Sequence, residues 1–79
     1  MIIADQIRAA RAMLRWSARE LAERSGVSLP TIQRMEAATG VPQAMARSIL
    51  AVTETLESAG IELIDENGGG PGVRFREPQ

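Results

Sequence analysis

All nine basic side chains of this 79-residue chain are arginines. A guanidinium group is a planar fork of hydrogen-bond donors that fits a phosphate or the edge of a guanine base. Arg34 belongs to a short polar run with Thr31 and Gln33, whose side chains can also contact phosphates or bases. An arginine-only composition is equally expected from a GC-rich genome. The arginines therefore indicate anion recognition without establishing it.

Histidine and cysteine are absent from the chain. Without them no Ser-His or Cys-His nucleophile can be built, and the usual zinc ligands are missing. The carboxylates show no spacing that singles out a catalytic pair. We therefore expect no enzymatic activity, no metal and no cofactor. The lack of cysteine also excludes disulfides and is compatible with a reducing cytoplasm.

The net charge of −1 conceals an asymmetry along the chain. Residues 1–47 carry seven arginines against four acids, whereas residues 48–79 carry two arginines against six acids. Charge asymmetry of this kind is a better guide to partners than the total. It favours an anionic partner for the N-terminal half. No apolar run approaches the ~18 residues of a membrane span, and residues 1–10 lack the apolar core of a signal peptide.

Local signals predict two short helices joined very tightly. The apolar residues of 3–14 recur three and four apart, which predicts a first amphipathic helix. Ser17 and Glu20 have the spacing of a capping box that opens a second helix, with Trp16 and Leu21 at the staple positions. Gly26 is well placed to end that helix.

A third helix is expected from Leu29 to about Ala38. Ser28 is its N-cap, and Pro30 falls in the first turn, where a missing N–H is harmless. Ile32 and Met35 would form its buried side. Because so few residues separate it from the second helix, the two must cross at a steep angle, and one of them stands out from the body.

The remainder predicts a long helix and a hairpin. Pro42 should open a helix that runs to residue 59, with an apolar stripe along one side. The segments "IELID" and "VRFR" flank "ENGGGPG" and predict two short strands. The expected fold class is mainly α, with about four helices and a C-terminal β-hairpin. We expect residues 1–59 to form one domain and residues 60–79 to form a dimerisation element.

Two capped helices joined by a glycine, with a polar outer side on the second, are the signature of a helix-turn-helix. The run "ELAERSGVS" followed by "TIQRME" resembles the Cro/C1-type regulators of bacteria and phages, also called the XRE family. The resemblance covers roughly residues 3–37. It implies a lambda-repressor-like bundle, a cytoplasmic and nucleoid-associated location in a bacterium or phage host, and double-stranded DNA as the partner.

The resemblance and the exposed start of the third helix together give the expected DNA-binding residues. A helix held away from the body can enter the major groove, and its N-terminus brings free N–H groups toward phosphate. Alanine at position 18, where many family members carry a phosphate-binding glutamine, removes one anchor. The expected DNA-binding residues are Ser17, Arg19, Ser28, Leu29, Pro30, Thr31, Gln33 and Arg34.

The resemblance also implies a partly buried ion pair between Arg11 and Glu36, which would tie the first helix to the third. We interpret both residues as scaffold. Arg8 and Arg15 are expected to touch phosphate or water.

A single helix-turn-helix covers about half of an operator, and dimers pair with two half-sites ~34 Å apart. The hairpin offers a means of pairing, because its strand edges leave backbone groups unpaired. The expected dimerisation residues are Ile61, Leu63, Ile64, Val73 and Phe75. Two alternatives remain open: the hairpin covers its own long helix, or the dimer forms through that helix.

We expect a transcriptional regulator, acting as a repressor, that binds a palindromic operator as a homodimer through helix 29–38. The alternative is a protein-interaction module, antitoxin-like or an anti-activator, that uses the same fold without specific DNA recognition. The acidic isoelectric point, Ala18 and the apolar Leu29–Pro30 start favour that alternative.

Overall fold

The computed structural model describes residues 1–78, which form four helices followed by a two-stranded antiparallel sheet. The helices are α1 (Ala4–Leu14), α2 (Ala18–Ser25), α3 (Leu29–Ala37) and α4 (Ala46–Ser58), and the strands are β1 (Ile61–Ile64) and β2 (Gly72–Phe75). This architecture confirms the mainly helical fold class with a C-terminal hairpin. None of the helices in residues 1–78 is long and apolar enough to cross a membrane.

The capping box predicted at Ser17 forms only in half. The Ser17 hydroxyl oxygen accepts a hydrogen bond from the Glu20 backbone N–H at 3.0 Å, so Ser17 is the N-cap of α2. The Glu20 carboxylate does not return to the cap but accepts hydrogen bonds from Arg24 at 3.0 and 3.2 Å. Arg24 lies one turn further along α2, and its guanidinium stacks over the Trp16 ring at 4.4 Å. This placement draws the Glu20 side chain away from the backbone of Ser17.

The prediction that Pro42 opens the long helix is wrong. Residues 38–45 form an irregular loop, and α4 begins four residues later than expected, at Ala46. Pro42 is buried, and the carbonyl of Gly40 accepts a hydrogen bond from the backbone N–H of Ala4 at 3.0 Å. The loop is therefore held against the start of α1 by tertiary contacts, which outweigh the local preference of proline for a first helical turn.

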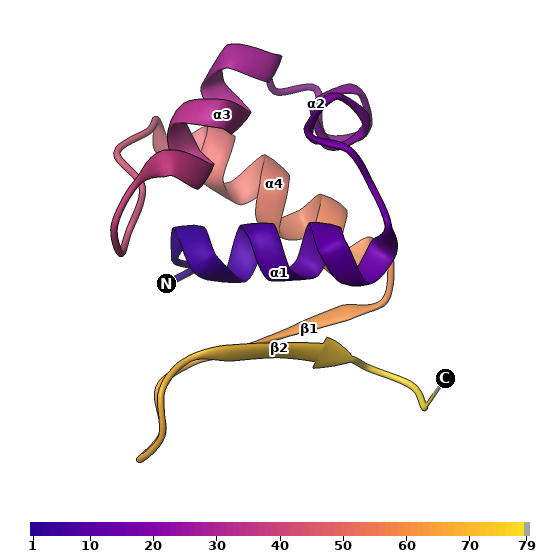
Figure 1. The fold of residues 1–79 in the computed structure, drawn as a ribbon, viewed down its shortest axis with the longest axis vertical. Helices are drawn as coiled ribbons and strands as arrows, with labels where there is room; N and C mark the ends of the chain where they lie inside the picture. The colour runs from indigo at the N-terminus through magenta and orange to yellow at the C-terminus, as the bar shows by residue number, and fades with distance from the viewer. Residues whose placement is uncertain (79) are drawn as a thin grey trace.

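The elements form three layers, as Figure 1 shows: the hairpin lies beneath α1 and α4, and α2 and α3 lie on the opposite side of these helices. The core joins side chains from every helix and from β1. Its fully buried large members are Ile7, Leu21, Ile32, Met35, Val52, Leu56 and Ile61. The hairpin is thus part of the same core as the helices.

The hairpin packs on its own chain through one face. Its register pairs Ile61 with Phe75 and Leu63 with Val73, and these four side chains all lie in or against the core. Ile64 lies on the other face of β1, with Glu62, and is half-buried. Four of the five residues expected at a dimer interface therefore contact the core of their own subunit.

Gln6 fastens the hairpin to α1. This side chain is buried, and its Nε2 donates to the carbonyls of Ile64 at 3.1 Å and Gly72 at 2.9 Å. Its Oε1 accepts a hydrogen bond from the backbone N–H of Ile3 at 2.9 Å, which caps the start of α1. The donor and acceptor of this buried side-chain amide are thus both satisfied, and the same bonds join α1 to the hairpin.

Two arginines of the tail also have structural partners. Arg74 forms a bidentate ion pair with Glu62 on the outer hairpin face, and this pairing lowers the pKa of the Glu62 carboxyl. The Arg76 guanidinium donates to the carbonyl of Glu57 at 2.7 Å, near the end of α4. Arg76 therefore places a cation at the C-terminal end of the helix, where the helix dipole favours positive charge.

Candidate nucleic-acid interface

The turn between α2 and α3 has only three residues. Gly26 adopts the left-handed conformation, with φ of 75°, and its N–H donates to the carbonyl of Ala22 at 3.0 Å. A residue with a β-carbon rarely adopts this φ, so glycine is the natural residue here. Val27 is buried, and Ser28 already caps the next helix. The chain therefore changes direction between α2 and α3 within three residues, and each of the three has a defined structural role.

The start of α3 is organised by a small polar network. The Ser28 hydroxyl accepts a hydrogen bond from the backbone N–H of Thr31 at 3.4 Å and donates to the Thr31 hydroxyl at 2.9 Å. The Arg34 guanidinium donates to the same Thr31 oxygen at 3.2 Å. Three of the expected DNA-binding side chains are therefore brought together along one side of α3.

The two sides of α3 differ sharply in burial. Ile32 and Met35 are buried in the core, as the sequence predicted. Pro30, Gln33 and Arg34 are exposed on the outer side. The helix is thus anchored by apolar side chains and presents polar and basic side chains to solvent.

Leu29 differs from its neighbours among the expected contacts. It is half-buried and packs against the core. Only part of this side chain is free to meet a partner, and Pro30 beside it offers an apolar ring. The first turn of α3 therefore has little capacity for hydrogen bonds to bases.

Residues of α2 adjoin the start of α3. Arg19 lines a groove together with Ser28 and Leu29, so the expected contacts on two different helices share one surface. Arg19 is exposed and has no carboxylate partner within residues 1–78. Ser17 is exposed at the opposite end of α2 from the turn, and its hydroxyl is already used as the helix cap.

The structure adds one basic residue that the sequence did not single out. Arg47, in the first turn of α4, lines a groove with Ser28 and Thr31 on the other flank of α3. It is exposed and carries no ion pair among the residues described. No motif marks Arg47, because only the path of the 38–45 loop brings it beside α3. The one sequence feature that could have pointed to Arg47 as a DNA contact is its position in the basic N-terminal half.

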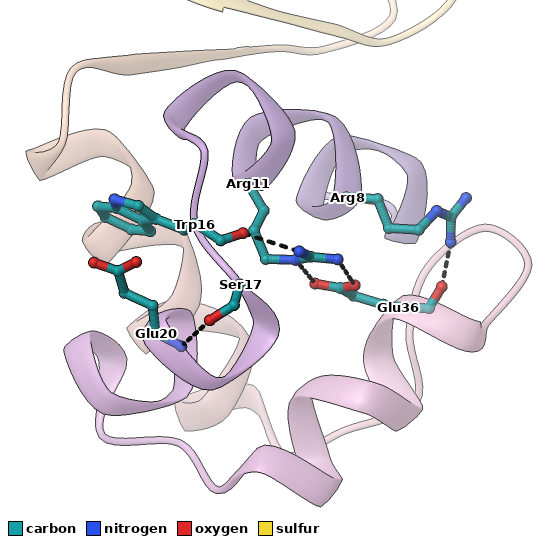
Figure 2. Close-up of polar contacts among 6 residues, drawn as sticks. All are labelled: Arg8, Arg11, Trp16, Ser17, Glu20 and Glu36. Atoms are coloured by element: carbon teal, nitrogen blue, oxygen red, sulfur yellow. Dashed lines mark hydrogen bonds and ion pairs between the residues drawn. The ribbon is translucent and has the colours of Figure 1, made fainter.

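An ion pair holds α3 on α1, as Figure 2 shows. Arg11 binds both carboxylate oxygens of Glu36, with Nε–Oε2 and Nη2–Oε1 distances of 2.8 and 2.9 Å. Its Nη1 donates to the carbonyl of Trp16 at 2.9 Å, just before α2. One guanidinium thus joins α1, the start of α2 and α3.

The pair is largely shielded from solvent. The side chain of Glu36 is 10% exposed and that of Arg11 is 25% exposed. The hydrogen bonds to Glu36 raise the pKa of Arg11 against the opposing effect of desolvation. The Arg11 guanidinium is occupied by Glu36 and the Trp16 carbonyl, which fits a scaffold better than a DNA contact.

Arg8 also serves the scaffold. It forms an ion pair with Asp5 at 3.1 Å and donates to the carbonyl of Glu36, as Figure 2 shows. The phosphate contact expected of Arg8 would have to compete with these partners. Arg15 has no ion pair within residues 1–78, and it ends α1 in the left-handed conformation, with φ of 59°.

A family comparison agrees with this geometry. The family model described as helix-turn-helix matches residues 7–55, which include α2, α3 and most of α1 and α4. No curated protein matches the chain. A match over more than half of the chain, with the capped α2 and α3 at its centre, shows the lambda-repressor-like fold and a DNA-binding function. The chain belongs to the Cro/C1-type (XRE) helix-turn-helix family of DNA-binding regulators.

Proposed function

We propose that this protein is a sequence-specific repressor that binds a palindromic operator as a homodimer, with α3 in the major groove. The observation that carries the proposal is the exposed polar side of α3, flanked by arginines on α2 and α4 that form no ion pair within residues 1–78. The major groove admits one α-helix, and the flanking cations fit the phosphates on either side of it.

Within this arrangement the side chains take different roles. Arg34 contacts a guanine edge and Gln33 an adenine edge, because these side chains project outward from α3. Arg19 and Arg47 contact phosphates and set the position of α3 in the groove. Ser28 and Thr31 adjoin the helix N-terminus, where backbone N–H groups favour an anion.

The short polar run on α3 limits direct base contacts. Leu29 and Pro30 can make only apolar contacts in the first turn of the helix. Part of the specificity therefore comes from the shape and deformability of the operator. Repression follows where such an operator overlaps a promoter, because the bound dimer excludes the polymerase.

Binding to DNA from immediately upstream of the protein's own gene, measured over a salt series, tests the proposal. A steep fall in affinity with salt and protection of one inverted repeat are expected. Equal affinity for unrelated DNA of the same length would reject sequence specificity. A reporter driven by the protected promoter then separates repression from activation.

The second candidate is a protein-interaction module built on the same fold. It is favoured by the exposed Pro30 at the start of α3 and by the exposed apolar residues Val41, Met45 and Leu50. Such a module would show weak, sequence-independent binding in the same salt series and would form a stable complex with another protein.

A further inference from the structure

We propose that Asn67, in the loop between β1 and β2, is a site of spontaneous deamidation that the folded protein leaves open to reaction. Asn67 is the one asparagine of the chain, and Gly68 follows it. Because glycine has no β-carbon, the backbone nitrogen after Asn67 is unshielded and its backbone is permissive. The inference concerns a segment that the proposed function does not use, so it is independent of DNA binding.

The reaction joins the Asn67 side chain to the next peptide group. The Gly68 nitrogen gives its proton to a solvent base and attacks Cγ of Asn67. A bond forms between this nitrogen and Cγ, the bond from Cγ to Nδ2 breaks, and Nδ2 takes a proton from solvent and leaves as ammonia. Water then opens the succinimide ring at either carbonyl carbon, which gives aspartate or isoaspartate at position 67. The sum is amide and water converted to carboxylic acid and ammonia.

Both reacting groups are accessible. Residues 65–70 are all exposed, and in Figure 1 the loop extends from the end of the hairpin away from the helices. Since β1 ends at Ile64 and β2 begins at Gly72, the strand ladder does not use the Gly68 N–H. Within residues 1–78 this N–H and the Asn67 side chain have no hydrogen-bond partner. The nitrogen can therefore be deprotonated, and the amide can rotate onto it, without the loss of an internal bond.

The backbone around the site is not confined by packing. Gly68 has φ of 104°, in the region that favours glycine. Gly69 and Gly70 follow, and a β-carbon built on any of these three glycines would meet no heavy atom of the packed chain within 4 Å. Closure of the ring needs rotation about the Asn67 backbone and side-chain bonds. No neighbouring element opposes that rotation.

The other side-chain amides are poorer candidates. They all belong to glutamines, at positions 6, 33, 43 and 79. A glutamine has one more methylene and must close a six-membered ring, which forms more slowly than the five-membered ring of asparagine. Gln6 is also buried, with both ends of its amide hydrogen-bonded. Deamidation of the folded chain should therefore begin at one position.

The modification adds charge to a loop that is already acidic. Asp65 and Glu66 precede the site, so the product carries three acidic positions in a row and one more negative charge than the formal −1 of the chain. The isoaspartate form also lengthens the main chain by one carbon. Gln6 holds the carbonyls of Ile64 and Gly72, one on each side of the loop, at 3.1 and 2.9 Å. The change is therefore confined to the loop, and the helices keep their packing.

Incubation of the intact chain at physiological temperature and mildly alkaline pH, followed by ion-exchange chromatography and peptide mass spectrometry, tests the inference. A parallel incubation in guanidinium chloride gives the rate without a fold. The variant Gly68→Ala places a β-carbon beside the attacking nitrogen. Gly69→Ala is the matched control, because it changes the same loop but leaves the Asn67–Gly68 pair intact, and its φ is not in the left-handed region.

The intact chain and Gly69→Ala are expected to lose ammonia from Asn67 at nearly the rate of the denatured chain, and faster as the pH rises, since the attacking nitrogen must be deprotonated. Gly68→Ala should react ~10-fold more slowly, because its β-carbon crowds that nitrogen and restricts the backbone. The modified protein should keep the circular dichroism of the unmodified chain.

An Asn67 that stays an amide in the folded chain while the denatured chain reacts would show that the fold protects the site, and would overturn the inference. Equal rates in Gly68→Ala and Gly69→Ala, or a first reaction at a glutamine, would overturn it as well. Loss of the helical signal on modification would contradict a change confined to the loop.

Discussion

At the residue scale, the arginines divide by what their guanidinium groups already contact. Arg11, Arg24 and Arg74 bind carboxylates of their own chain at distances of 2.8 to 3.0 Å. Arg19 and Arg47 have no such partner within residues 1–78, and Arg34 has only a hydroxyl. The sequence shows nine equivalent cations, whereas the fold leaves these three available around α3. Whether an arginine is available depends on the tertiary partner of its side chain, and the spacing of arginines along the sequence does not reveal that partner.

Arg34→Ala should weaken binding to the specific site by ~1–3 kcal/mol and relax the base preference at one position. The reason is that the guanidinium fork that we propose contacts guanine is lost, while Ile32 and Met35 keep α3 anchored in the core. Fluorescence anisotropy with the specific site and with single-base variants of it measures both effects. An equal loss on every sequence would make Arg34 a phosphate contact, and no loss would remove it from the interface.

Arg47→Ala should weaken binding to all DNA sequences alike and should reduce the salt slope by about 1, because one phosphate contact is lost. Arg74→Ala is the matched control. It changes the net charge equally but lies on the hairpin, at the far end of the molecule from α3. If both variants lose the same affinity, the effect comes from the net charge of the protein, and the phosphate contact of Arg47 is rejected.

At the element scale, the helix-turn-helix depends on α3 being held firmly against α1. The bidentate bond between Arg11 and Glu36 and the bond from Arg11 to the Trp16 carbonyl provide that hold. Removing one partner of a buried pair leaves an uncompensated charge, which costs ~3–5 kcal/mol when burial is complete. Here Arg11 keeps some solvent contact, so the lower end of that range applies.

Glu36→Ala should therefore lower the free energy of unfolding by ~3 kcal/mol, measured by urea denaturation followed by circular dichroism. Its affinity for DNA, corrected for the folded fraction, should be unchanged. Normal stability would contradict the scaffold role. A loss of affinity beyond the unfolded fraction would show that Glu36 also positions the groups that contact DNA.

Gln6→Ala should loosen the hairpin while leaving α2 and α3 in place. The buried amide bridges α1 to the carbonyls of Ile64 and Gly72, and losing it should cost ~1–3 kcal/mol. Amide hydrogen exchange should rise in β1 and β2 much more than in α3. Uniform acceleration across the molecule would instead mean that the hairpin and the helices open only together.

The particular elements also show which structural features can be predicted from sequence. The starts of α2 and α3 follow from Ser17 and Ser28, because an N-cap acts on backbone groups only three residues away. The same local reasoning failed at Pro42, where the loop is held by the start of α1. The role of Gln6 in joining α1 to the hairpin could not be predicted either, since its hydrogen-bond partners lie 58 and 66 residues further along the chain.

At the scale of the whole molecule, a chain of this size depends on every part of its single core. Ile61 is fully buried, and three further hairpin side chains pack against the same core. Fully burying one such side chain stabilises a protein by ~1.5–3 kcal/mol. The three partly buried side chains add less each, but the four together are a substantial share of the ~5–15 kcal/mol that stabilises most native proteins.

A chain that ends at Gly60 should therefore be strongly destabilised, and thermal melting followed by circular dichroism measures this. The expected result is a transition at a much lower temperature than that of the intact chain. A truncated chain that melts cooperatively near the temperature of the intact chain would show that the hairpin is an appendage, as a division at residue 59 suggested.

The most direct test of the central claim, that α3 presents sequence-specific contacts to DNA, is selection of bound duplexes from a random-sequence pool by the intact protein and by Arg34→Ala. The account predicts one enriched inverted repeat for the intact protein, and the same repeat with at least one base preference lost for the variant. Enrichment of no motif, or of an identical motif by both proteins, would contradict it.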